Sequence, residues 1–156
     1  MLENCKSAQE RWGGVSNIID RWLVERQDLL VQYCELSEAA GSVTNYKNCG
    51  SQLQSLCQIL VDYISAGHFE VYDQLMREGR DFDDQEGLKR ASKSFEIVDS
   101  STEYILDFND KYQETDDTDD LIEDLSHLGE VLASRFEAED SMIKVLHVAH
   151  KDQATT

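Results

Sequence analysis

Three charged residues occupy positions where a helical repeat otherwise places apolar side chains. Arg26 lies between Trp22 and Leu29, and Arg135 and Glu139 lie four residues apart, on one face of a helix. Because burying an unpaired charge costs several kcal/mol, these groups should pair with one another or open onto water. They therefore predict a polar layer inside a helical bundle, which is either a structural lock or the floor of a pocket.

A histidine lies next to the inward-facing positions of the second helical repeat. His68 follows the short run 65–67, which contains Ser, Ala and Gly. A histidine beside small residues on a four-helix scaffold is typical of phosphotransfer modules, but the lysine that usually follows it is missing, and Glu70 and Asp73 would repel a phosphate. Histidine phosphotransfer through His68, or another enzyme activity of such a bundle, is the alternative to a binding function.

Other patterns that support catalysis are missing from the sequence. Di-metal bundles need a Glu-x-x-His pattern from each of two helices, and only Asp124 and His127 have a comparable spacing here. The four cysteines form no Cys-x-x-Cys pair, and there is no glycine-rich phosphate loop. We therefore expect a protein that is not an enzyme, with no catalytic residues, no metal and no cofactor.

The elements that must position these residues are visible as apolar repeats. Four segments place apolar residues alternately three and four positions apart, namely 15–36, 53–75, 88–112 and 121–146. These repeats predict an all-α four-helix bundle, with a single domain over residues 1–150 and a frayed tail over 151–156. Gly13 and Gly14 are unfavourable inside a helix, so we expect a kink or a short preceding helix there.

Charge restricts the kind of partner. The 156 residues carry a net charge of −18, and residues 81–156 hold 21 acidic and 7 basic side chains. Such a field repels nucleic acids and anionic membrane surfaces and attracts a basic protein. No apolar run approaches the length of a membrane span, and the N-terminal residues do not resemble a signal peptide, so we expect a cytoplasmic protein.

One side of the second segment carries a possible binding patch. Asp62, Ala66 and Phe69 fall together on its outward side, because they are spaced by four and then three residues. An exposed aromatic ring beside a small residue and a carboxylate is typical of a protein-binding surface. Alternatively, Phe69 packs under the connection that follows Leu36.

Several runs of sequence carry a resemblance to a known family. The most specific is Leu-Val-Asp-Tyr-Ile-Ser-Ala-Gly-His-Phe over 60–69, and further matches occur at 10–15, 19–23, 29–31, 57–58, 128–130, 133–137 and 139–140. With these runs the chain resembles the regulator of sigma D (Rsd)/AlgQ family, and the run 3–14 looks closest to the AlgQ branch. The region 38–50 and the third segment match poorly.

The resemblance implies an anti-sigma factor. Family members bind the C-terminal promoter-reading domain of the primary sigma factor, a small basic helix-turn-helix, and hide its contacts with core RNA polymerase and promoter DNA. The partner implied is therefore that sigma domain, with no direct contact to nucleic acid or membrane. The resemblance implies that Asp62 contacts an arginine of the sigma domain and that Ala66 and Phe69 belong to the same binding surface.

The resemblance also places two further groups of residues. On the first segment, Ile18 and Trp22 would supply apolar contact with sigma or the backing for it. The seam charges would support the binding surface from within, as an internal polar layer of six residues: Asp20, Arg21, Arg26, His68, Arg135 and Glu139.

Overall fold

The computed structural model describes residues 8–41, 49–114 and 118–152, and these residues are helical almost throughout. The helices are α1 (Ala8–Gly41), α2 (Gly50–Ala66), α3 (Tyr72–Asp81), α4 (Gln85–Glu114) and α5 (Leu121–Leu146). A π-helical turn, η3 (Gly67–Val71), joins α2 to α3, and a short 3₁₀ turn, η4 (Val148–His150), follows α5. Most of the predicted frayed tail, residues 153–156, lies outside this description.

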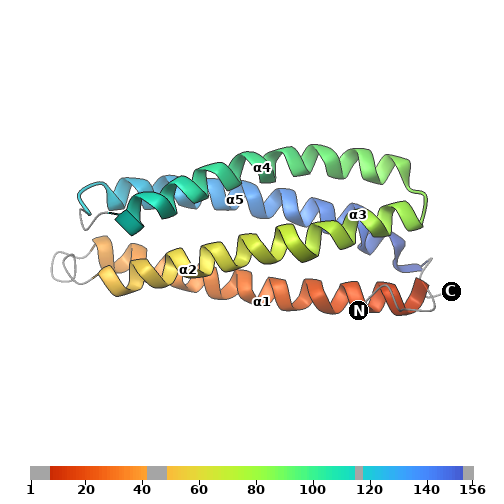
Figure 1. Ribbon diagram of the computed structural model, residues 1–156, viewed down its shortest axis with the longest axis horizontal. Coiled ribbons are helices and arrows are strands. Elements are labelled where there is room, and N and C mark those ends of the chain that lie inside the picture. Colours follow the sequence, from red (N-terminus) through yellow and green to blue (C-terminus); the bar gives the residue numbers. More distant parts are fainter. Residues whose placement is uncertain (1–7, 42–48, 115–117, 153–156) are drawn as a thin grey trace.

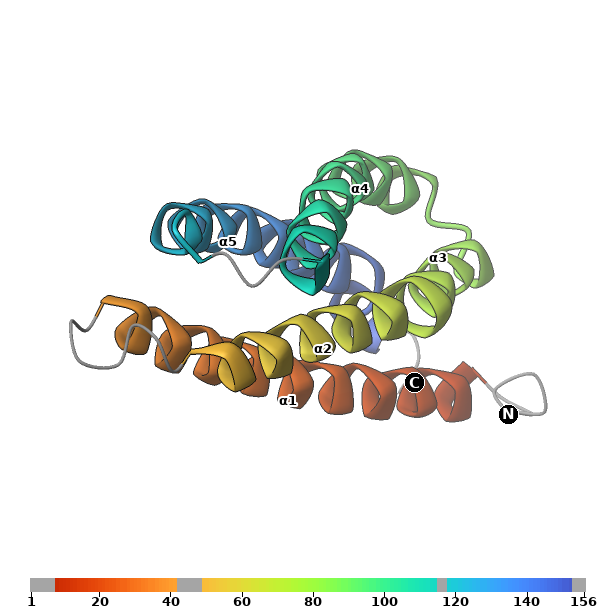
Figure 2. The ribbon, with the colours of Figure 1, turned by 60° about the vertical axis from the view of Figure 1, so that its left-hand side comes forward.

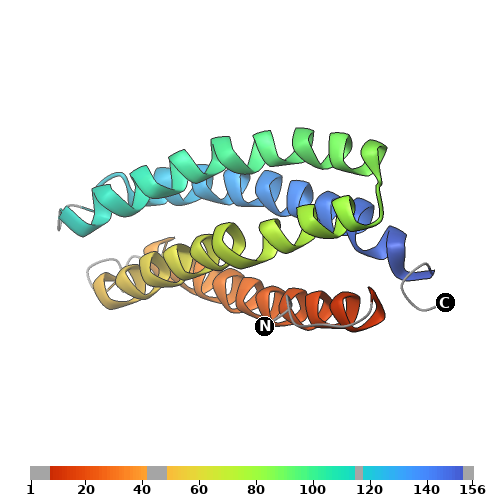
Figure 3. The same ribbon diagram turned by 45° about the vertical axis from the view of Figure 1, so that its right-hand side comes forward.

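The helices form two pairs. Figure 1 shows α1 beside α2 and α4 beside α5, and the views in Figures 2 and 3 show the same pairing. Since α2, η3 and α3 follow one another as a single rod, the arrangement is a four-helix bundle. The predicted all-α fold is thereby confirmed, and the described residues contain no strand.

The first helix is longer than its glycines suggest. α1 runs for 34 residues and passes through Gly13 and Gly14 without interruption, so no separate short helix precedes it in the described part of the chain. Apolar contacts outweigh the cost of two glycines, because Val15, Ile18 and Ile19 are all buried directly after them.

The second predicted segment contains an irregularity that periodicity does not reveal. The turn η3 has π-helical hydrogen bonding, which fits one extra residue into a turn. At the end of this turn the consecutive residues Val71 and Tyr72 are both buried, and α3 continues with Leu75 in the core. The expected inward positions of this segment are buried in the structure: Leu53, Cys57, Leu60, Ile64, Gly67, Val71 and Leu75.

The core follows the four predicted repeats, and the ends of the helices are fastened by polar contacts. Large aliphatic residues from every long helix are fully buried, including Leu29, Leu60, Ile105 and Leu128. α4 begins at a capping carboxylate, because the backbone N–H of Gly87 donates to Asp84 Oδ1 over 2.8 Å. None of the described helices is both long enough and apolar enough to cross a bilayer.

Candidate functional site

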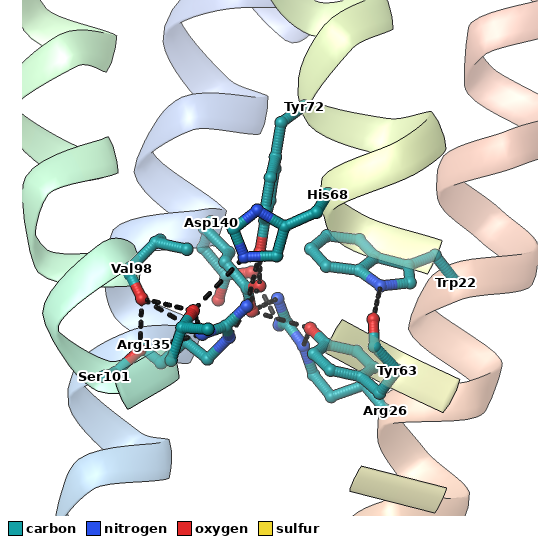
Figure 4. Close-up of polar contacts among 11 residues, drawn as sticks. Trp22, Arg26, Tyr63, His68, Tyr72, Val98, Ser101, Arg135 and Asp140 are labelled. Carbon is teal, nitrogen blue, oxygen red and sulfur yellow. Dashed lines mark hydrogen bonds and ion pairs between the residues drawn. The ribbon is translucent and has the colours of Figure 1, made fainter. Parts of the chain in front are cut away.

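A buried ion pair lies at the centre of the bundle. Arg135 and Glu139 on α5 are almost completely buried, and the Nε atom of the arginine lies 3.3 Å from Oε2 of the glutamate. The hydroxyl of Tyr63 donates to Glu139 Oε1 over 2.6 Å, and the hydroxyl of Tyr72 donates to Oε2. Figure 4 shows Tyr63, Tyr72 and Arg135 converging from α2, α3 and α5.

The guanidinium of Arg135 also fastens α4. Its Nη1 atom donates to the carbonyl of Val98 over 3.1 Å, to Ser101 Oγ over 2.9 Å and to Thr102 Oγ1 over 2.7 Å. Its Nη2 atom donates to the hydroxyl of Tyr72 over 3.0 Å. One arginine thus joins three helices, and these polar groups use their hydrogen-bonding capacity on one another.

The network reaches the surface through α1. Arg26 donates from Nε to the hydroxyl of Tyr63 over 3.0 Å, and its Nη2 lies 3.4 Å from Glu139 Oε1. Its Nη1 pairs with Asp140 Oδ1 at 2.6 Å, and Asp140 is exposed. The guanidinium also lies over the ring of Phe136, 4.7 Å from its centre. Arg26 is therefore the link between the buried layer and solvent.

The electrostatics of the layer keep its two tyrosine hydroxyls protonated. Burial raises the pKa of Glu139, while the positive charge of Arg135 and the two tyrosine hydroxyls oppose this rise. Burial, followed by the neighbouring Glu139, raises the pKa of Tyr63 and of Tyr72 well above the ordinary tyrosine value. Both hydroxyls therefore stay protonated and act as donors, which holds four helical segments in one register.

His68 borders this layer from η3. It is half-buried, its Nε2 lies 3.2 Å from Thr102 Oγ1, and its ring meets the rings of Tyr72 and Phe95 edge-on. Burial, and then the positive charge of Arg135, lower the pKa of His68. An imidazole whose Nε2 faces a threonine within the bundle is poorly placed to receive a phosphoryl group at that atom.

Two residues predicted for the polar layer do not belong to it. Asp20 and Arg21 are exposed on α1, away from Arg135 and Glu139. Successive residues of a helix point in directions about 100° apart. Because Trp22 points into the core, Asp20 and Arg21 point toward solvent. The layer also contains residues that the helical repeats did not predict, namely Tyr63, Tyr72, Ser101, Thr102 and Asp140. A signal was available for Tyr63, since a buried tyrosine requires a partner for its hydroxyl.

A second feature is an acidic cluster where α1 and α2 meet the solvent. Asp62 is exposed on α2, and its Oδ1 accepts a hydrogen bond from Gln58 over 3.0 Å. Partial burial, followed by the negative charges of Asp62 and Asp28, raises the pKa of Glu25 on α1. Three carboxylates from two helices therefore lie within electrostatic reach. Sequence analysis singled out Asp62 alone, because the pairing of α1 with α2 is a tertiary contact.

The apolar residues predicted for sigma binding are divided between surface and core. Phe69 is 87% exposed, which contradicts the alternative that it packs under the connection after Leu36, and Ala66 is partly buried. Ile18 is 6% and Trp22 2% exposed, so of the two roles expected for them, contact or backing, their burial favours backing. The indole of Trp22 stacks on Tyr63, with ring centres 4.8 Å apart, and so supports α2 beside Asp62 from within.

Comparison with known proteins agrees with the resemblance seen in the sequence. A family model described as "Regulator of RNA polymerase sigma(70) subunit, Rsd/AlgQ" matches residues 1–147. The chain belongs to the Rsd/AlgQ family. Curated relatives named "Regulator of sigma D" from Salmonella arizonae, Salmonella typhi and Salmonella newport are each 35% identical to it, over 99% of this chain and 96% of the relative.

The Rsd/AlgQ match covers α1 to α5 and ends at residue 147, where contacts of His147 join the end of α5 to α1 and α3. His147 Nδ1 lies 2.8 Å from Glu78 Oε2 on α3, and the carbonyl of His147 accepts a hydrogen bond from Trp12 Nε1 over 2.9 Å. The rings of Trp12 and His147 stack, with centres 4.3 Å apart. In this Rsd/AlgQ chain the acidic cluster and the buried layer therefore both lie within the matched region.

Proposed function

We propose that this protein is an anti-sigma factor that binds the basic C-terminal promoter-reading domain of the primary sigma factor. Bound there, it blocks the contacts of sigma with core RNA polymerase and with promoter DNA, and so modulates transcription. It acts by occupancy rather than by catalysis, in the cytoplasm where the polymerase works. Membership of a family of sigma(70) regulators supports this proposal.

The observation that carries the proposal is the acidic cluster of Glu25, Asp28 and Asp62. Partial burial raises the pKa of Glu25, and the negative charges of Asp62 and Asp28 add to this rise, so the three carboxylates repel one another in the free protein. A cationic side chain placed among them relieves that repulsion, and an arginine can meet a carboxylate through two parallel hydrogen bonds. The cluster thus favours a partner that presents arginine.

An apolar contact lies next to this charged one. Phe69 is 87% exposed in η3, directly after α2, and Ala66 leaves little side chain between it and Asp62. In protein interfaces a few residues contribute most of the binding free energy, and an aromatic residue beside a complementary charge is typical of them. We propose that Asp62, Ala66 and Phe69 contact sigma, while Ile18 and Trp22 act as backing only.

The test measures binding of the isolated C-terminal sigma domain by calorimetry. Wild-type protein should bind at low ionic strength, and Asp62→Ala should weaken binding by about tenfold to a hundredfold. The matched control is Asp107→Ala, an exposed aspartate on α4. If Asp62→Ala binds as tightly as wild type, the interface lies elsewhere; if wild type does not bind at all, the function itself is wrong.

A separate assay addresses the phosphotransfer alternative. Incubation with phosphohistidine donors should leave no acid-labile phosphate on wild-type protein, because His68 Nε2 faces Thr102 at 3.2 Å. Phosphate that appears on wild type and is lost in His68→Gln would instead establish phosphotransfer.

A further inference from the structure

A groove lies between α4 and α5, and none of its lining residues belongs to α1 or α2. It has a volume of about 410 Å³, and its apolar lining consists of Ile97, Tyr104 and Val131. Ile97 is 47% exposed and lies beside the partly buried Tyr104 and Val131, so the three side chains together form an apolar patch. The lining spans residues 96–104 of α4, which is about 12 Å or two helical turns.

The groove has an acidic border. Glu96 forms part of its lining, and the carboxylate of Glu130 lies 3.8 Å from Nδ1 of His127, another lining residue. Over their whole length α4 and α5 carry thirteen carboxylates against six lysines and arginines. A second copy of this chain is therefore an unfavourable occupant, because two molecules of net charge −18 would meet at their acidic faces.

We infer that this groove is a second docking surface, which takes a short cationic amphipathic helix of another protein. The apolar face of such a helix covers Ile97, Tyr104 and Val131, and its lysines or arginines meet Glu96 and Glu130 at the border. Two turns of groove match anchors at positions i, i+3, i+4 and i+7 of the ligand helix. The surface is independent of the sigma-binding face proposed above, so both partners can be bound together.

The probe is a synthetic peptide of about 14 residues, with leucines at i, i+3, i+4 and i+7 and lysines elsewhere. It is titrated into the isotope-labelled full chain, and the methyl signals of Ile97 and Val131 are followed by NMR. We expect saturable shifts centred on the groove. A peptide of the same composition with scrambled leucines should bind about tenfold more weakly.

Variants separate this groove from general attraction to an acidic protein. Ile97→Lys should weaken binding of the leucine–lysine peptide about tenfold, and Glu96→Lys should weaken it at low salt. The matched control is Leu106→Lys, 43% exposed and half a turn around α4 from Ile97. Together with Asp62→Ala, it should leave binding unchanged.

Three results would overturn the inference. Equal weakening by Ile97→Lys and Leu106→Lys, or shifts spread without saturation over all acidic residues, would mean attraction without a defined site. Self-association of the wild type that Ile97→Lys abolishes would make a second copy the occupant. Loss of peptide binding in Asp62→Ala would place the peptide on the sigma-binding face.

Discussion

At the scale of single residues, Arg135 and Glu139 define one another's environment. Burying either charge alone would be costly. The carboxylate of Glu139 is compensated by Arg26 and two tyrosine hydroxyls. The guanidinium of Arg135 donates hydrogen bonds to Val98, Ser101 and Thr102. Removing one partner leaves an uncompensated charge in the core, so the residues of this layer should be sensitive to substitution.

The first prediction compares two arginines that sequence analysis assigned to the same layer. Arg135→Met should lower the free energy of unfolding by about 3–5 kcal/mol, because Glu139 loses its buried ion pair. Arg21→Met, at an exposed position, should change it by less than about 0.5 kcal/mol. Urea denaturation followed by circular dichroism measures both, and similar losses in the two variants would contradict the structure of the layer.

The second prediction concerns pH and the pair that closes the end of the bundle. Burial raises the pKa of Glu78 above 4.5, with His147 opposing the rise. A carboxyl with a raised pKa in the folded state stabilises the fold at pH below its unfolded pKa, and this contribution is lost as the pH rises through the folded pKa. The stability advantage of wild type over Glu78→Gln should therefore be largest near pH 4 and decrease toward pH 7.

Denaturant unfolding of both proteins across this pH range measures the difference. An advantage that instead grows as the pH rises would show that the ionised Glu78 is stabilised by His147 more than it is destabilised by burial.

At the scale of helical elements, the turn η3 decides how α2 presents its outward face. One extra residue in this turn brings Tyr72 into the core, where its hydroxyl reaches Glu139 and Arg135, and leaves Phe69 in solvent. Gly67 permits this packing, because a Cβ atom there would lie 2.9 Å from the ring of Tyr72 and 3.2 Å from Trp22.

The third prediction uses two glycines inside helical structure. Gly67→Ala should destabilise the protein by about 1–3 kcal/mol, because the added methyl group displaces Tyr72 from the buried layer. Gly13→Ala, where the added methyl group meets nothing within 4 Å, should stabilise it by about 0.5–1 kcal/mol. Thermal unfolding gives the sign directly, and a stabilising Gly67→Ala would mean that η3 accommodates a side chain without moving Tyr72.

At the scale of the whole molecule, the net charge is distributed unevenly along the chain. Residues 81–156 contribute −14 of the net charge of −18, yet the proposed sigma contact lies on α1 and α2. The larger acidic pole acts at long range and attracts any basic domain, while Asp62 and Phe69 act only once contact is made. We therefore expect salt to change mainly the association rate and substitution of a contact residue to change mainly the dissociation rate.

The fourth prediction separates these contributions by kinetics. Raising the salt concentration from about 50 to about 500 mM should lower the association rate constant for the sigma domain about tenfold or more, because screening shortens the reach of the field. Asp62→Ala should act mainly by speeding dissociation. Stopped-flow fluorescence measures both rates, and an association rate that does not respond to salt would contradict electrostatic steering.

Periodicity and composition alone predicted the four-helix bundle, the inward positions of each helix and a polar layer that contains Arg135 and Glu139. These properties follow from local spacing, because residues three and four apart share a helix face wherever the helix packs. The family resemblance, carried largely by the run 60–69, was likewise evident in the sequence and is confirmed by the match over residues 1–147.

Only the tertiary structure decided which residues of other helices join the polar layer and the acidic cluster. The hydroxyls of Tyr63 and Tyr72, the exposure of Asp20 and Arg21, and the approach of Glu25 and Asp28 to Asp62 depend on how separate helices are rotated against one another. The contacts of the Tyr72 ring with Trp22 and Phe95 likewise join residues from separate helices. Sequence spacing specifies a face of one helix, whereas a site made by several helices requires their relative placement, which long-range packing alone determines.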